Sequence, residues 1–116
     1  MAMISRNEVI EYCMTFPGAY EDYPFEDFNW TVMRRKDTCR GFCWIFEREG
    51  RIWINIKADP GWAEFWRGNY ASIRPGYHMN KKHWISIILD GTVPDEMTEG
   101  MIGESYDLCG PKRKRV

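Results

Sequence analysis

The stretch RPGYHMNKKHW, residues 74–84, brings together two histidines, three basic side chains, an asparagine and two aromatic rings. Arginine and lysine contact phosphates and aromatic rings stack on bases, so this composition is typical of nucleic-acid-binding surfaces. A second basic run, residues 34–36 (RRK), and the ring of Trp53 could belong to the same surface. The candidate phosphate contacts are Arg74, Lys81, Lys82 and His83, and the candidates for loop support or stacking are Tyr77, His78, Asn80 and Trp84.

The same stretch also has a purely structural interpretation. Pro75 and Gly76 are a pair typical of turns, and Asn80 can bridge backbone groups as an Asx turn. Tyr77 and Trp84 would then anchor the loop to the core, while the histidines and lysines face water.

Residue spacing disfavours both metal binding and catalysis. His78 and His83 are five residues apart, too far for one helical turn, and the lysines between them would repel a cation. Cys39 and Cys43 have no second ligand pair at zinc-finger distance. The sequence also contains no G-x-S-x-G, Gly-rich phosphate loop or H-E-x-x-H pattern. We therefore predict a non-enzymatic protein with no metal and no cofactor.

Charge is distributed unevenly along the chain. The net charge is −1, but residues 112–115 (KRKR) hold four of the sixteen basic residues, which leaves 12 basic against 17 acidic groups, a net −5, in the remainder. The negative net charge of this remainder does not attract phosphate, so nucleic-acid binding would need a local basic patch or the basic tail. No apolar run approaches the roughly 20 residues of a membrane helix and the start has no signal-peptide pattern, so we predict a cytoplasmic protein with reduced, free cysteines.

Local patterns predict three helices and four strands. Ser5 and Glu8 form a capping box that opens a helix over residues 6–15. Alternating residues predict strands from Trp30 to about 36, over 42–46 and over 51–57, the last two joined by a turn at Gly50. A further strand over 84–89 and a last helix after Pro94 follow. The acidic, aperiodic segment AYEDYPFEDFN, residues 19–29, is expected to be an irregular surface connection rather than a cation site.

Two faces of these elements carry specific expectations. In the strand over 51–57, Ile52, Ile54 and Ile56 should face the core, and the opposite face with Trp53 should be at most half covered. The helix that begins at Pro60 carries an aromatic stripe that should pack on the sheet, namely Trp62, Phe65 and Trp66. In the last helix, Gly100 and Gly103 should each cost about 1 kcal/mol relative to alanine.

The order of elements indicates an α+β domain over residues 1–110, in which a mostly antiparallel sheet has helices packed on one face, followed by a basic tail over 111–116. The other face of the sheet, polar and aromatic, is then the natural place for a partner.

Six short motifs carry a resemblance to a known family. PGYHMNKKHW, ILDGTVPDE and ESYDL, together with FPG, DYPFED and WINIKADP nearer the start, resemble the MmcQ/YjbR-like family over about residues 4–114. The resemblance implies a CyaY-like fold with a double-wing arrangement, and proteins of this family are described as predicted DNA-binding. We therefore expect a binding module that contacts DNA through the 74–84 stretch. The alternative is a small-molecule or protein-interaction module that uses the aromatic face of the sheet.

Overall fold

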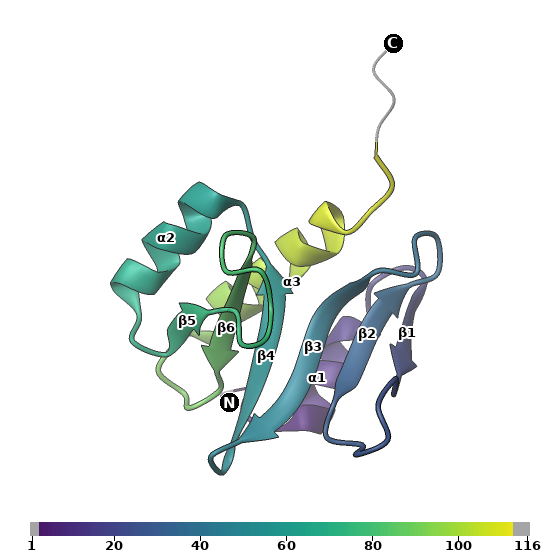
Figure 1. The fold of residues 1–116 in the computed structure, drawn as a ribbon, viewed down its shortest axis with the longest axis horizontal. Helices are drawn as coiled ribbons and strands as arrows, with labels where there is room; N and C mark the ends of the chain where they lie inside the picture. Colours follow the sequence, from purple (N-terminus) through teal and green to yellow (C-terminus); the bar gives the residue numbers. More distant parts are fainter. Residues whose placement is uncertain (1–2, 113–116) are drawn as a thin grey trace.

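A six-stranded antiparallel sheet and three helices make up the fold in the computed structural model, which describes residues 3–112 (Figure 1). The strand order is β1-β2-β3-β4-β6-β5. The helices are α1 (Arg6–Cys13), α2 (Pro60–Asn69) and α3 (Asp95–Leu108). The strands are β1 (Ala19–Asp22), β2 (Thr31–Arg35), β3 (Gly41–Arg48), β4 (Arg51–Lys57), β5 (Ile73–Pro75) and β6 (Trp84–Ile88). The predicted α+β class with a mostly antiparallel sheet is confirmed. Residues 113–116 of the predicted basic tail lie outside the described residues.

Local sequence signals account for several element boundaries. The hydroxyl of Ser5 accepts a hydrogen bond from the Glu8 backbone N–H while the Glu8 carboxylate accepts from the Ser5 N–H, which is the predicted capping box of α1. Between β3 and β4 the turn has two residues, Glu49 and Gly50, with φ of 55° and 73°. Two successive positive φ values match a type I′ turn, whose twist suits an antiparallel hairpin. No helix within residues 3–112 is long and apolar enough to cross a membrane.

Both edge strands differ from the sequence-based expectation. The segment predicted as an irregular connection begins with β1, which pairs antiparallel with β2. Strand β5 begins at the last residue of the predicted link and includes Arg74 and Pro75, the first residues of the 74–84 stretch. Ala19 is the only buried residue of β1, and β5 is three residues long and ends in Pro75. Edge strands are short, tolerate proline and need no continuous apolar row, so they carry little periodic signal.

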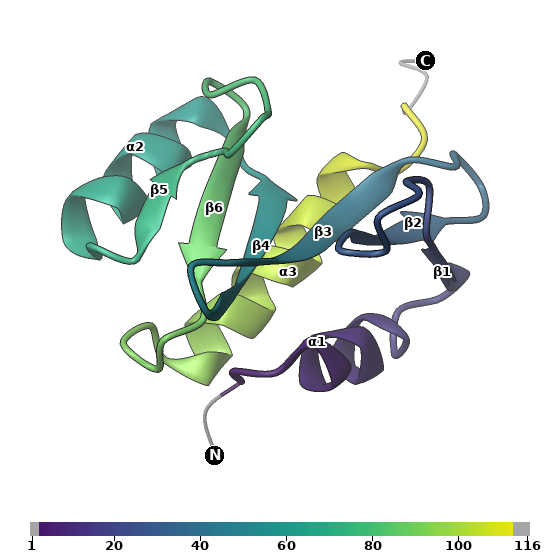
Figure 2. The same cartoon turned by 60° about the horizontal axis from the view of Figure 1, so that its bottom comes forward.

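The core lies between the sheet and two helices, α1 and α3, which cover the same face of the sheet (Figure 2). Ile54 and Ile56 of β4 and the facing residues of β6, Ile85 and Ile87, are fully buried there. The opposite face was predicted to be half covered at most, and this is wrong. Trp53 is 4% exposed and Asn55 is fully buried because residues 76–83, here the 76–83 loop, fold over this face in front of β4 and β6 (Figure 1).

A bulge in β3 divides its aromatic residues between the two faces. The pairing of β2 with β3 shifts between Met33 and Arg34, so that Phe42 is an extra residue. Phe42 consequently contacts the ring of Tyr106 on α3, at a centroid distance of 5.2 Å. Phe46 lies on the other face, where it stacks on Tyr77 of the 76–83 loop. Simple alternation would have placed Phe42 and Phe46 on one face.

The predicted packing of the α2 aromatic stripe on the sheet is wrong for Trp62 and Phe65, whereas Trp66 is partly buried against the core. Helix α2 lies beside β5 (Figure 1), Trp62 is 52% exposed and Phe65 is 49% exposed. Ala63 is the buried residue of this helix. A small residue lets the helix backbone approach β5 closely, and this contact turns the side chains of Trp62 and Phe65 toward solvent.

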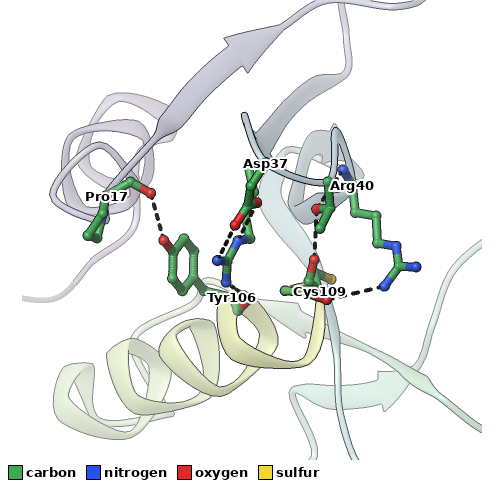
Figure 3. A network of polar contacts seen from close by, with 8 residues as sticks. Pro17, Asp37, Arg40, Tyr106 and Cys109 are labelled. Carbon is green, nitrogen blue, oxygen red and sulfur yellow. Dashed lines mark hydrogen bonds and ion pairs between the residues drawn. The ribbon is translucent and has the colours of Figure 1, made fainter. Parts of the chain in front are cut away.

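The carbonyl end of α3 is held by the β2–β3 connection (Figure 3). The last turn of α3 contains no basic residue. Instead, the Arg35 guanidinium donates to the Tyr106 carbonyl at 2.9 Å, the Thr38 hydroxyl donates to the Cys109 carbonyl at 2.8 Å, and Arg40 reaches Gly110. These donors satisfy carbonyls that have no partner within the helix, and the arginines place positive charge at the negative end of its dipole.

Candidate ligand-binding site

The 76–83 loop is fastened to the sheet by a closed set of buried hydrogen bonds. Asn55 of β4 donates from its side-chain amide to the Tyr77 carbonyl at 2.8 Å. The Tyr77 backbone N–H donates to the hydroxyl of Ser86 on β6 at 2.9 Å, and this hydroxyl donates to the Asn55 side-chain oxygen. Because each of these polar groups has a partner, a fully buried asparagine is tolerated in the sheet.

The Tyr77 ring fixes the position of the same loop through aromatic contacts. It stacks on Phe46 with 5.5 Å between centroids and lies 6.2 Å from Trp53. The guanidinium of Arg48 lies 4.6 Å from the Tyr77 centroid and 4.9 Å from that of Trp53. Stacking and cation–π contacts of this kind add to the burial of the ring. Tyr77 therefore supports the loop from beneath.

Two polar residues of the 76–83 loop bind its own backbone. The Lys81 ammonium donates to the carbonyls of Gly76 and Met79, at 2.6 and 3.1 Å. The side-chain oxygen of Asn80 accepts from the Lys82 N–H at 2.9 Å, which is the Asx-type turn considered from the sequence. Gly76 is required by space, since a Cβ there would lie 2.8 Å from the Trp84 Cβ. Hydrogen bonds within the loop therefore fix its conformation without a ligand.

An open cavity of about 610 Å³ lies where this loop meets the 23–30 segment that connects β1 to β2. One wall comes from the loop, another from the segment, and Trp44 of β3 completes the lining. The lining residues are Phe25, Glu26, Asp27, Trp30, Trp44, His78 and Met79. Motifs that are fifty residues apart in the sequence, DYPFED and PGYHMNKKHW, therefore meet at this cavity.

The aromatic lining is a connected, rigid set. The Trp30 ring stacks on Phe46 at 4.2 Å between centroids and meets Trp44 edge to face at 6.4 Å. Phe25 meets Trp30 edge to face at 6.1 Å. Because Phe46 also stacks on Tyr77, the same ring contacts both the cavity lining and the 76–83 loop. Such a lining offers flat apolar surface to a ligand.

The charged residues that line the cavity are two carboxylates, Glu26 and Asp27, both exposed. Asp27 accepts a hydrogen bond from the Asn29 N–H at 3.1 Å. The Arg6 guanidinium donates to the Asn29 side-chain oxygen in the 23–30 segment at 3.4 Å. Arg34 lies 5.7 Å from the Trp44 centroid and forms an ion pair with Asp22 at 2.7 Å. That pair is close to neutral, so the lining has negative character.

Comparison with known proteins identifies the family of this chain. The YjbR family model matches residues 14–108. The chain belongs to the YjbR family. Uncharacterised protein YjbR of Escherichia coli K12 is 34% identical over 112 residues, which cover 94% of this chain and 92% of that protein. Uncharacterised protein YyaQ of Bacillus subtilis is 31% identical over 117 residues, which cover 91% of this chain and 98% of that protein. The crystal structure of DR2400 from Deinococcus radiodurans superposes with a TM-score of 0.84 at 32% identity, over 91% of this chain and 78% of that one.

Within this YjbR-family fold, the predicted site residues separate into three groups. Arg74 and Lys82 are exposed, and neither forms an ion pair within residues 3–112. Tyr77, Asn80 and Lys81 hold the loop, while His83 and Trp84 are half-buried at its end. His78 lines the cavity, with φ of 60°. The proposed phosphate contacts thus stay a prediction for Arg74, Lys82 and His83, whereas the Lys81 ammonium is engaged by backbone.

Sequence reasoning did not identify the aromatic part of the cavity. Phe25 lies in a segment without periodicity, and the alternation around Trp30 and Trp44 predicts only that they belong to strands. The available signal was the DYPFED motif, in which two exposed aromatic residues alternate with carboxylates and proline. An irregular segment that repeatedly exposes aromatic rings is unusual for a plain surface connection, since large apolar side chains are normally covered.

Proposed function

We propose that this YjbR-family protein is a non-catalytic binding module that takes a small organic ligand in the cavity between the 76–83 loop and the 23–30 segment. The observation that carries the proposal is the cavity itself, about 610 Å³ and walled by Phe25, Trp30 and Trp44. This volume lies within the roughly 300–1,000 Å³ of small-molecule sites, which are mainly apolar with a few polar groups.

Binding is favoured over catalysis by where the nucleophilic side chains lie. Cys13, Cys43 and Cys109 are buried in the core, and Cys39 is exposed in the β2–β3 connection. None of the four lines the cavity. The candidate proton-transfer groups of the lining are His78, Glu26 and Asp27, and no serine or cysteine nucleophile in the described part of the chain lines the cavity with them. A nucleophile with a base within hydrogen-bond reach is the arrangement that covalent catalysis uses.

A fragment screen tests the proposal. Saturation-transfer NMR would record binding of a library of small aromatic compounds to the wild-type protein, to Phe25→Ala and to Trp44→Ala. Trp62→Ala, which removes an exposed aromatic ring from α2, is the matched control. We expect fragments that bind the wild type and the control but not the cavity variants. Absence of any binding fragment, or binding that both cavity variants retain with an unchanged fold, would overturn the proposal.

DNA binding is a second candidate, favoured by the exposed and ion-pair-free Arg74 and Lys82. Other basic groups are engaged: Lys81 binds loop carbonyls, Arg34 pairs with Asp22, and Arg35 pairs with Asp37. The carboxylates beside the loop would also repel phosphate.

Fluorescence anisotropy with a labelled duplex over a salt series tests this candidate. If DNA binds through the loop, Arg74→Ala with Lys82→Ala should weaken binding and flatten its salt dependence. Equal binding by the double variant would remove the loop from consideration.

A further inference from the structure

We infer that the ligand of this cavity is an aromatic cation, that is, a planar ring system that carries a positive charge. This inference rests on the proposed function and adds the ligand's chemical class. It combines two features of the same seven-residue lining, the tryptophan rings and the carboxylates.

The first step concerns the rings. Trp30 and Trp44 are the aromatic residue type that attracts cations most strongly over the ring face. The two rings meet edge to face at 78°, so a planar ligand that stacks on one ring lies edge-on to the other. The chain already uses this attraction beside the cavity, where the Arg34 guanidinium lies over Trp44. A flat, positively charged ligand would stack on apolar area and gain the same cation–π attraction.

The second step concerns charge. Glu26 and Asp27 line the cavity, and within residues 3–112 no lysine or arginine does so. The cation beside Trp44, Arg34, has its own counter-charge in Asp22 at 2.7 Å and is half-buried. His78 is the remaining titratable group of the lining. Two carboxylates next to low-dielectric aromatic walls attract cations and repel anions, which disfavours phosphates and carboxylates as ligands.

The third step concerns size and access. A lysine side chain of a partner protein would present a narrow alkyl ammonium, which leaves most of the 610 Å³ unfilled. A fused-ring cation fills more of this volume and contacts Phe25 as well as the tryptophans. Phe25, Glu26 and Asp27 of the 23–30 segment and His78 of the loop are exposed, so the cavity opens to solvent between these two walls, with the carboxylates at the opening. The ligand therefore enters past the carboxylates, which can steer it.

Three matched probes test the inference: N-methylquinolinium as the cation, quinoline as its uncharged parent, and 2-naphthoate as the anion. Each is titrated into ¹⁵N-labelled full-length protein at pH 7.5, with NMR shift changes that locate the site. We expect N-methylquinolinium to bind about tenfold more tightly than quinoline, the size of a partly desolvated cation–π contact. The shifts should centre on Trp44 and Met79, and added salt should weaken the complex.

A charge-matched pair of double variants completes the test. Glu26→Gln with Asp27→Asn should reduce the preference for the cation, because the carboxylate attraction is lost while the tryptophan rings stay in place. Glu11→Gln with Glu64→Gln, which removes two exposed carboxylates elsewhere, should preserve the preference.

Each outcome separates the inference from the proposed function. If quinoline or 2-naphthoate binds the cavity as tightly as the cation, the inference fails while the proposed function stands. Cation binding that centres on α2, or a preference for the cation that Glu26→Gln with Asp27→Asn leaves unchanged, also overturns it. If no probe shifts the cavity residues but the fragment screen finds an uncharged ligand there, only the inference fails. If the screen is empty as well, both fail.

Discussion

Asn55 shows how one buried polar residue determines the shape of the candidate site. Its amide and the Ser86 hydroxyl are fully buried, and both bind the backbone of Tyr77. Removal of one partner would leave a buried donor or acceptor unsatisfied, which costs more than a hydrogen bond contributes on average. The loop that supplies His78 and Met79 to the cavity depends on this network.

Asn55→Ala should lower the free energy of unfolding by about 1–3 kcal/mol, because the Tyr77 carbonyl and the Ser86 hydroxyl each lose a partner. Urea denaturation measures the loss, and NMR shifts of residues 76–83 report release of the loop. Asn69→Ala, which removes an exposed asparagine that bonds only its own helix, is the control. A loss no larger than the control's would show that the loop is held by its aromatic contacts alone.

At the scale of elements, the β2–β3 connection and α3 depend on one another. Arg35 joins the Tyr106 carbonyl to the Asp37 carboxylate and lies over the Tyr106 ring at 3.9 Å. The Tyr106 hydroxyl donates to the Pro17 carbonyl, which ties the end of α1 to the same place (Figure 3). An end of a helix that lacks basic residues of its own is thus stabilised by elements distant in sequence.

The Arg35–Asp37 pair predicts a pH dependence. The hydrogen bond from Arg35 lowers the pKa of Asp37 below its ordinary value. A carboxyl whose pKa is lower in the folded state stabilises the fold above its unfolded pKa, and this contribution is lost as the pH falls through the folded pKa. Wild type should therefore exceed Asp37→Asn in Tm at pH 7, and the difference should shrink below about pH 4.

Thermal unfolding of both proteins from pH 7 to pH 2 measures this difference, with Glu64→Gln on α2 as the control. A Tm difference between wild type and Asp37→Asn that does not change with pH would contradict the prediction.

At the scale of the whole molecule, the two faces of the sheet are covered by different means. Helices α1 and α3 lie on the core face, whereas the 76–83 loop and the 23–30 segment lie over the other (Figure 1, Figure 2). Aromatic side chains of the loop, the segment and the sheet pack together there. The cysteines follow this division, with three buried as free thiols and Cys39 exposed. Burial raises the pKa of the Cys43 thiol and of the Cys109 thiol, and only the thiolate is reactive.

The native protein should consequently show one fast-reacting thiol toward a disulfide reagent such as DTNB. The other three should react only as fast as the structure opens, and faster in urea. Cys39→Ser should abolish the fast phase and leave the slow phases unchanged. Two or more fast thiols in the wild type would mean that the core around α1 or α3 opens more readily than its burial indicates.

The sequence alone determined the family, the α+β class, the central strands and the ends of several elements. These features depend on residues close together in the chain: the capping box at Ser5, the turn at Gly50, and the alternation in β4 and β6. Each is decided by interactions within one element or one hairpin, so local residue patterns suffice to predict it.

Only the tertiary structure decided the edge strands, the bulge at Phe42, the rotation of α2 about Ala63 and the cavity. The physical reason is that each depends on contacts between segments that are remote in sequence. Phe25, Trp44 and His78 come from three parts of the chain, and no local pattern states that they meet. Their meeting depends on how the 76–83 loop and the 23–30 segment pack over the same face of the sheet, where non-local packing overrides local preference.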